Sequence, residues 1–282
     1  MIAAMTWKTL LVHLDDGVRC AERVALASNL AARHGAHLVG LSPTGHPDLR
    51  LSVHADVPDR VEVAALTART LREMAQARSA GFERDARAAG APSVEARIVV
   101  DQHLDAVARH GRWADLVVIG QTDRGADLPG IAWNFPQQVA LQTGGPVLIV
   151  PRTGHFPSIG RSVLVGWKDA RECARALRDA EPLLAGARRV VLLEVVAPGT
   201  AAEGSLLDDV QHRLMRQGIA VEAQREATSL DAGEALLSRA AELGVDAIVM
   251  GAYGHTRLRE WVLGGVTRLV LDHMAMPTIM TH

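Results

Sequence analysis

The residues best placed to do chemistry lie in one glycine-rich segment near the end of the chain. Two residues separate Gly251 from Gly254, nine separate Gly254 from Gly264, and Gly265 follows, which is the spacing G-x2-G-x9-G. Glycines let the backbone approach a ligand closely, and free N–H groups at the start of a helix attract anions. Because an expected strand precedes this segment and an expected helix follows it, the spacing predicts binding of phosphate.

Several neighbouring residues are further candidates for contacts with such a ligand. Lys168 follows another expected strand, and it either meets an anionic ligand or is a surface cation beside an aspartate. His255 lies inside the loop, where it either touches a phosphate or is simply exposed. The complete set of candidate binding residues is Met250, Gly251, Gly254, His255, Gly264, Gly265, Val266, Thr267 and Lys168.

The remaining reactive side chains indicate no catalytic or metal site. His34 and His37 straddle a helix end rather than facing one side of a helix. Cys20 and Cys173 lie at matching points on apolar helix faces, where small core residues are expected. No general base and no metal-binding carboxylate stand near the glycine loop in the sequence, so we expect no enzyme activity.

The elements that position these residues form a tandem repeat. Residues 8–20 align without a gap with residues 161–173, a shift of 153, and residues 114–120 align with 245–251, a shift of 131. A fixed internal similarity of this kind marks one structural unit that occurs twice. It predicts a first domain over 1–152, a linker over 153–160 that is rich in glycine and proline, and a second domain over 161–282.

Short β-branched runs alternate with helical patterns in both copies, which predicts an α/β fold with a parallel sheet covered by helices. In the second copy we expect strands at 162–167, 189–196, 219–225, 247–251 and 277–280, and helices at 170–184, 203–216, 231–243 and 266–274. In the first copy, residues 58–89 predict a longer helix that follows an irregular stretch at 42–57. Asp231 and Glu234 are expected to stabilise a helix start.

The repeat, the glycine spacing and the starts of both copies resemble the universal stress protein family over essentially the whole chain. Those starts read Val-His-Leu-Asp15-Asp-Gly and Val-Gly-Trp-Lys168-Asp-Ala. The resemblance implies two tandem, Rossmann-like copies of a five-stranded parallel α/β sandwich with strand order 3-2-1-4-5. In that family the fold is usually paired as a dimer through its last strand, so the two copies are expected to form an intramolecular pseudo-dimer. Some members bind ATP with this loop.

The resemblance therefore implies a cytoplasmic, non-catalytic protein of the stress response whose second domain binds ATP or another adenine nucleotide. Whether Mg²⁺ accompanies the nucleotide stays open. Two positions in the second copy depart from the pattern of the ATP-binding members. Gly265 stands where they carry Ser or Thr, and Lys168 stands where they carry an aspartate. The alternative is a ligand-free interaction or scaffold protein in which the duplication serves assembly alone.

The first copy keeps Asp15 but has lost the loop glycines. At the shift of 131, Asp123, Trp133 and Asn134 occupy the positions of the three loop glycines Gly254, Gly264 and Gly265. An aspartate and an indole where phosphates would lie add negative charge and bulk, both of which oppose binding. We therefore expect the first copy to bind no nucleotide in this way.

Composition excludes several other classes of function. The net charge of the 282 residues is -2 and only 3% of them are aromatic, so the chain lacks the basic field and stacking side chains of nucleic-acid binders. No apolar run approaches the roughly 18 residues that a membrane-spanning helix needs, and we see no signal peptide. Two cysteines fit a reducing compartment. We expect a cytoplasmic protein, with homodimerisation and unidentified protein partners left open.

Overall fold

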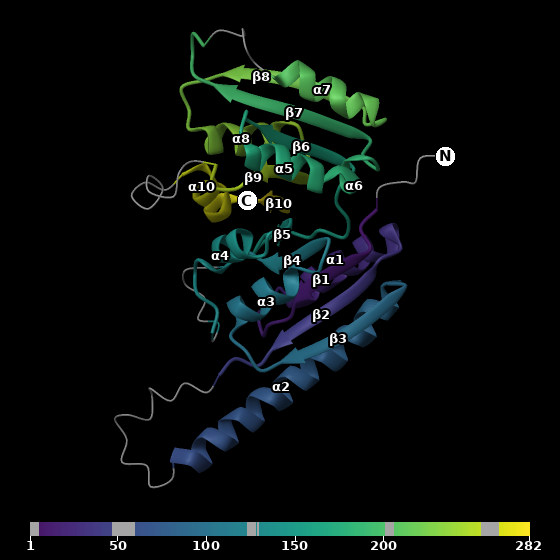
Figure 1. Cartoon of the computed structure of the whole chain (residues 1–282), viewed down its shortest axis with the longest axis vertical. Helices are drawn as coiled ribbons and strands as arrows, with labels where there is room; N and C mark the ends of the chain where they lie inside the picture. The colour runs from purple at the N-terminus through teal and green to yellow at the C-terminus, as the bar shows by residue number, and fades with distance from the viewer. Residues whose placement is uncertain (1–5, 47–59, 123–127, 129, 201–205, 255–264) are drawn as a thin grey trace.

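The computed structural model describes residues 6–46, 60–122, 128, 130–200, 206–254 and 265–282 (Figure 1). In these residues the strands are β1 Thr9–His13, β2 His37–Pro43, β3 Ser93–Val99, β4 Leu116–Gly120, β5 Val147–Val150, β6 Ser162–Trp167, β7 Arg189–Val196, β8 Val221–Ala227, β9 Ala247–Gly251 and β10 Thr278–Thr281. The helices are α1 Cys20–His34, α2 Arg60–Ala88, α3 His103–Gly111, α4 Phe135–Gln142, α5 Arg171–Asp179, α6 Glu181–Leu184, α7 Leu207–Arg216, α8 Ala232–Glu242 and α10 Val266–His273.

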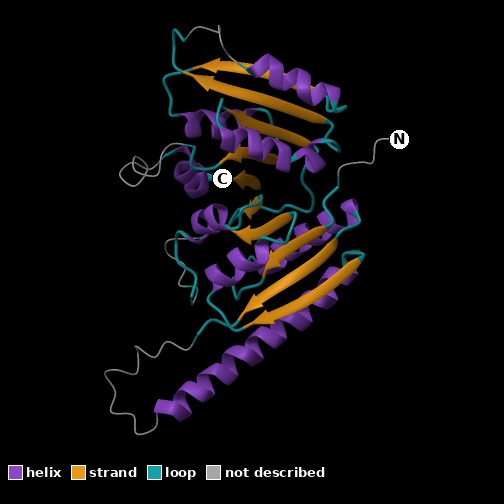
Figure 2. Cartoon of the chain, in the orientation of Figure 1, coloured by secondary structure: helices purple, strands orange, loops and turns teal. Residues whose placement is uncertain are grey.

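The strands join into one ten-stranded sheet with the order β3-β2-β1-β4-β5-β10-β9-β6-β7-β8 (Figure 2). All neighbouring strands are parallel except β5 and β10, which meet antiparallel at the centre. The order 3-2-1-4-5 that the family resemblance implies is confirmed in the first half, and the second half repeats it in mirror order. The last strands of the two halves therefore pair with each other within one chain.

Helices cover both faces of this sheet because the strand residues alternate between two cores. In β6, Val163 and Val165 belong to one buried cluster, whereas Leu164 between them belongs to the other. The first cluster contains side chains of α1, α2, α5, α6 and α7, and the second contains side chains of α3, α4, α8 and α10. Each cluster includes residues from both halves of the chain. Alternation with a period of two thus builds two continuous cores across the β5–β10 pair.

Most predicted elements of the second half match the structure closely. The strands β6, β7 and β9 have the predicted bounds, and Asp231 caps α8 by accepting a hydrogen bond from the Gly233 N–H over 2.8 Å. The single helix predicted over 170–184 is wrong, because α5 ends at Asp179 and a separate α6 begins at Glu181. Pro182, in the first turn of α6, has no N–H to continue the preceding helix.

Other boundaries shift by a few residues. The strand predicted over 219–225 is β8, Val221–Ala227, and the long helix predicted over 58–89 is α2, Arg60–Ala88. The helix predicted over 203–216 is α7, Leu207–Arg216, which begins after the N-cap residue Leu206; residues 203–205 lie outside the described residues. Of the irregular stretch predicted over 42–57, Ser42 and Pro43 belong to β2, and residues 47–57 lie outside the described residues.

The segment between β5 and β6 is held against α1 by side chains of that helix. Glu22 accepts a hydrogen bond from the Phe156 N–H over 2.6 Å, and Arg33 donates to the Ile159 carbonyl oxygen over 2.6 Å. Arg19, just before α1, donates to the Gly154 carbonyl oxygen over 2.5 Å. The connection between the two halves is therefore fixed to the first half along its length.

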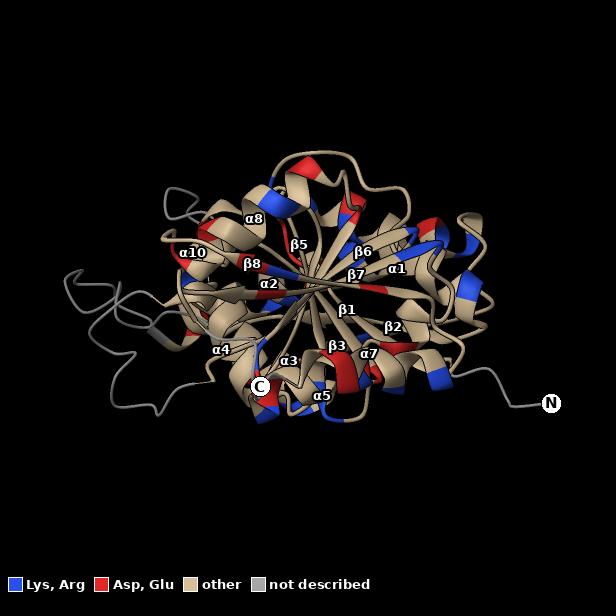
Figure 3. Cartoon of the chain, turned by 90° about the horizontal axis from the view of Figure 1, so that it is seen from above, with Lys and Arg blue, Asp and Glu red and all other residues tan. Residues whose placement is uncertain are grey.

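Charged residues lie mainly on the outer elements of the molecule. In the view of Figure 3, most of the blue and red stretches of ribbon lie on the outer helices and loops, while most of the strands in the centre are tan. Among the described helices, none has the length and apolar character that crossing a membrane requires.

We predict that Ile279→Ala destabilises the whole chain, because Ile279 lies fully buried on β10 and pairs with Leu148 of β5. Loss of such a side chain costs about 2–5 kcal/mol of unfolding free energy. Urea unfolding, followed by circular dichroism, measures this loss of unfolding free energy. The matched control is Val18→Ala, because Val18 is 97% exposed. A loss no larger than that of the control would contradict the shared core.

Candidate functional site

The predicted binding residues of the second half gather at one edge of the sheet. Gly166 of β6 is in register with Met250 of β9, and Gly251 of β9 is in register with Thr281 of β10. Lys168, which is exposed, and the residues after Gly251 therefore leave the sheet at the same carboxyl edge. Ligands of parallel α/β sheets bind beyond this edge. His255 and Gly264, two of the predicted contacts, lie outside the described residues.

The start of α10 lies at this edge and has the features of an anion site. Gly265 is the N-cap residue, so it has no side chain with which to cap the helix, and its carbonyl oxygen accepts the N–H groups of Arg268 and Leu269. The first-turn N–H groups of Val266 and Thr267 point out of the helix start, where the helix dipole is positive. This arrangement favours a phosphate or a carboxylate.

Thr267 has a structural contact in addition to its place in the first turn of α10. Its side chain is 5% exposed, and its hydroxyl oxygen accepts a hydrogen bond from the Tyr253 N–H over 3.2 Å. Tyr253 has a φ of 58°, a left-handed conformation that costs energy for a residue other than glycine. The contact with Thr267 helps to hold this strained residue and so joins the end of β9 to α10.

Gly251 and Gly254 both lie close to the start of α5. A Cβ atom on Gly251 would stand 2.7 Å from the Cys173 backbone nitrogen, so no larger residue fits without a shift of backbone. A Cβ atom on Gly254 would stand 3.3 Å from Oε2 of Glu172. The first glycine is therefore required for packing whether or not a ligand is bound, and the second lies beside a carboxylate.

Glu172 is a residue of this site that sequence reasoning missed. Its side chain is 4% exposed, and its Oε1 accepts a hydrogen bond from Nε of Arg171 over 2.6 Å. Burial alone would raise the pKa of Glu172, but the hydrogen bond and the charge of Arg171 lower it below its usual range. A negative charge therefore lies beside Gly254. No local motif signals it, because the contact arises from the packing of α5 against β9.

The two cysteines behave as the sequence predicts. Cys20 and Cys173 pack at the edge of the same buried cluster, at equivalent places on α1 and α5. Burial raises the pKa of both thiols. Thiols that stay protonated are poor nucleophiles, so both cysteines serve as core side chains.

The corresponding helix start in the first half lacks the features of an anion site. Asn134 is the N-cap residue of α4, at the position that Gly265 has before α10. Pro136 lies in the first turn of α4 and has no N–H to offer an anion. Trp133 lies immediately before this N-cap residue. Asp123, which the sequence places opposite Gly254, lies outside the described residues.

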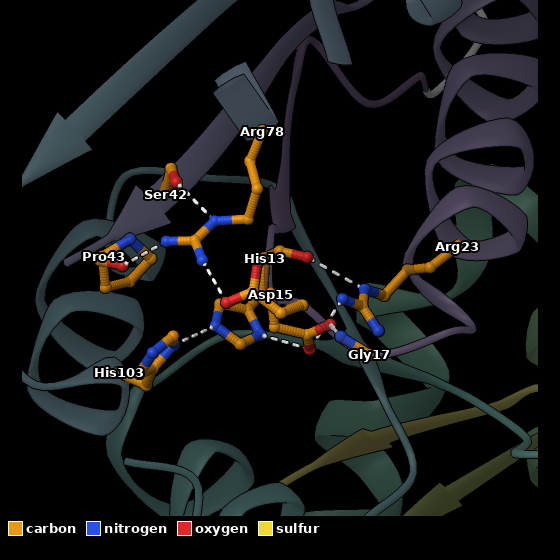
Figure 4. A network of polar contacts seen from close by, with 9 residues as sticks. His13, Asp15, Gly17, Arg23, Ser42, Pro43, Arg78 and His103 are labelled. Atoms are coloured by element: carbon orange, nitrogen blue, oxygen red, sulfur yellow. Dashed lines mark hydrogen bonds and ion pairs between the residues drawn. The ribbon is translucent and has the colours of Figure 1, made fainter. Parts of the chain in front are cut away.

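Buried charged groups fill the carboxyl edge of β1 in the first half (Figure 4). Asp15 is 8% exposed and forms an ion pair with Arg23 of α1, with 2.8 Å between Oδ2 and Nη2. Its Oδ1 accepts the Gly17 N–H over 3.0 Å, and Nε of Arg23 donates to the His13 carbonyl oxygen over 2.9 Å. A Cβ atom on Gly120 would stand 2.5 Å from Nη1 of Arg23, so this guanidinium occupies the space beside β4.

Two histidines continue this network toward α3. His13 is fully buried, and its Nε2 lies 2.8 Å from Nδ1 of His103, the first residue of α3. On the other side, Arg78 of α2 contacts Asp16 over 2.5 Å and Ser42 over 3.2 Å. Side chains from three helices therefore meet at the end of β1.

The second half has two small residues and one exposed lysine at the positions where the first half has this network. At the shift of 153, His13 corresponds to Gly166 and Arg23 to Ala176, and Asp15 corresponds to Lys168. Sequence reasoning singled out only the last of these differences. Comparing the copies residue by residue would have revealed the other two, since each replaces a small residue by a large polar one.

Burial controls the ionisation of this network. Burial lowers the pKa of His13 well below its usual value and lowers that of His103 to about 4, so both rings are neutral near pH 7. Burial would raise the pKa of Asp15, but the charge of Arg23 outweighs it and holds the pKa below its usual range. The buried part of the network at neutral pH therefore consists of the Asp15–Arg23 ion pair and two neutral rings that share a hydrogen bond.

Where the chain is described, no three histidine, cysteine, aspartate or glutamate side chains gather in a group suited to a metal ion. The histidine pair noted in the sequence makes separate contacts. His37 faces Ser93 over 2.8 Å, whereas the ring of His34 packs against Trp7.

We predict that Arg23→Ala strongly destabilises the first half, because it leaves the Asp15 carboxylate buried without its partner. Breaking a buried ion pair in this way costs about 3–5 kcal/mol. Thermal and urea unfolding measure the loss. Arg69→Ala, which breaks the exposed i,i+4 pair with Glu73, is the control and should cost well under about 1 kcal/mol. Equal losses for both variants would contradict the role of the ion pair.

We also predict that stability falls as pH drops from about 6.5 toward 4. The unfolded chain binds protons on His103 at a pKa near 6.5, whereas the folded chain binds them only near 4, so acid favours unfolding across that window. His34, whose pKa burial also lowers to about 4, adds to the effect. His103→Asn should reduce the slope of unfolding free energy against pH in this window. Identical slopes in the two proteins would refute the assignment.

Comparison with family models and solved structures identifies proteins that are similar to this chain. Residues 160–282, which contain β6 to β10, match the model of the Universal stress protein family. A universal stress protein from Archaeoglobus fulgidus DSM 4304 is similar over 97% of this chain and 95% of its own, with a TM-score of 0.73 and 16% sequence identity. No curated protein sequence matches the chain.

Two solved structures from Pseudomonas aeruginosa are also similar over nearly the whole chain. A functionally unknown protein from strain PAO1 covers 98% of this chain and 92% of its own, with a TM-score of 0.55 and 16% identity. A putative universal stress protein from strain UCBPP-PA14 covers 98% and 93%, with a TM-score of 0.54 and 16% identity. At these identities the similarity establishes the fold of both halves.

Proposed function

We propose that the second half of this chain, whose residues 160–282 match the model of the universal stress protein family, binds an adenine nucleotide, ATP in the first instance, without catalysing a reaction. The observation that carries this proposal is the start of α10. There an N-cap glycine and the first-turn N–H groups lie at the carboxyl edge, beside the residues that follow β6 and β9. These groups suit the phosphates of the ligand.

The contrast between the halves supports a single site. In the first half, Arg23 and His13 fill the carboxyl edge, and Pro136 removes a donor from the helix start. We therefore propose domains over 1–152 and 161–282, joined by residues 153–160, in which the first serves as a pseudo-dimer partner without a ligand. In this proposal the chain acts in the cytoplasm in the stress response.

Mg²⁺ is compatible with this site. Cells hold most ATP as its magnesium complex, and Mg²⁺ is usually bound through one or two carboxylates together with the phosphates of the ligand. Glu172, ionised and adjacent to Gly254, is the residue that would contact such an ion. Without the metal, the same charge would weaken phosphate binding, so the affinity for ATP should depend on Mg²⁺.

A second candidate function is that of a ligand-free scaffold. The packing of Gly251 against Cys173 favours it, because that glycine is needed even if nothing binds. Mass spectrometry of small molecules released from the native protein separates the two functions. If no nucleotide is released and millimolar ATP leaves the melting temperature unchanged, the scaffold function holds. Saturation at about 100 times the dissociation constant should instead stabilise the chain by about 2.7 kcal/mol.

We predict that Gly254→Asp strongly weakens ATP binding, because it places a second carboxylate beside Glu172 and close to the proposed position of the phosphates. Titration calorimetry should show a loss of roughly tenfold or more in affinity. Gly81→Asp is a matched control, since Gly81 lies on α2, where an added Cβ meets only the end of Arg84 at 3.8 Å. Unchanged affinity in Gly254→Asp, with a native circular dichroism spectrum, would refute the site.

A further inference from the structure

Trp133 is a large aromatic side chain of the first half that contacts the helix at the proposed site of the second half. It precedes α4 and is 49% exposed. The Cζ atom of Arg268, on α10, lies 5.9 Å from the centre of its indole ring. A guanidinium within about 6 Å of an indole is attracted by the negative face of the ring. The first half thus touches the first turn of α10.

One contact across the β5–β10 pair and one within the first half hold the backbone near the indole. Nε2 of Gln121 donates to the Leu271 carbonyl oxygen of α10 over 2.7 Å, and the Thr122 hydroxyl donates to the Trp133 carbonyl oxygen. The helices α4 and α10 lie on the same side of the sheet, next to this pair of strands (Figure 1). The contact between Trp133 and Arg268 is therefore a consequence of how the two halves pair.

Arg268 is well placed to act on an anion at the start of α10. It is the third residue of the helix, and its side chain is 46% exposed. Its Nε lies 3.7 Å from Oδ2 of Asp272 while its Cζ lies over the Trp133 indole, so both neighbours hold the same guanidinium in one position. Holding the positive charge near the helix start strengthens an anion site there.

We propose that Trp133 is a positioning residue for the nucleotide site of the second half, holding the Arg268 guanidinium beside the first turn of α10, where it meets the phosphates. This inference rests on the proposed function. It makes the site composite, since the backbone donors and the arginine come from one half and the aromatic support comes from the other.

The test compares tryptophan variants by calorimetric titration with ATP. Trp133→Ala should weaken ATP binding roughly fivefold, whereas Trp133→Phe, which keeps an aromatic face, should restore most of the affinity. Trp113→Ala is the matched control, because Trp113 is 83% exposed and lies before β4, at the opposite edge of the sheet. It should bind like the wild type.

A further measurement distinguishes positioning from a general effect on structure. Trp133→Ala should cause no additional loss in a chain that already carries Arg268→Ala, because the indole acts through the guanidinium.

Wild-type affinity in Trp133→Ala, or additive losses with Arg268→Ala, would overturn the role of Trp133 while leaving the nucleotide site intact. A wild-type chain that binds no ATP would overturn both the site and the inference that rests on it.

Discussion

The antiparallel pairing of β5 with β10 is the interaction on which the rest of the structure depends. Only three residue pairs form it, between Val147–Ile149 and Thr278–Met280, yet it joins two five-stranded sheets into one. Because the paired strands are buried on both faces, the helix layers of the two halves close over the same two cores. The pairing also places the residues before α4 next to α10, so it determines which groups of one half can reach the edge of the other.

The two halves use the same edge of the sheet in opposite ways. In the first, an ion pair between Asp15 and Arg23 and a pair of neutral histidines satisfy one another and occupy the space. In the second, the smaller residues Gly166 and Ala176 replace the histidine and the arginine, and Leu236 of α8 packs against Gly166. Buried charges stabilise a fold only when their partners stay in place. Backbone N–H groups at a helix start, in contrast, can bind an anion from solution. One edge is therefore suited to stability, and our proposal gives the other a role in recognition.

Sequence patterns, the internal repeat and the family resemblance together predicted most of the fold. The two shifts of the repeat place β1 on β6, β4 on β9 and α4 on α10, and the family resemblance supplied the strand order, which the structure confirms. The break at Pro182 was readable but was missed, because the apolar pattern continues through it. The contact of His13 with His103 joins residues 90 positions apart, and the approach of Glu172 to Gly254 depends on helix packing. Such contacts have no local signature, so the candidate site was less predictable than the fold.

The covalent link between the halves frees this chain from a constraint on symmetric assemblies. In a homodimer with two-fold symmetry, every substitution appears twice, so both copies of a site change together. Here Arg23 and Ala176 occupy equivalent places in one chain and can differ. Selection can therefore act on the two carboxyl edges separately, because a substitution in the first half does not change the residues of the second.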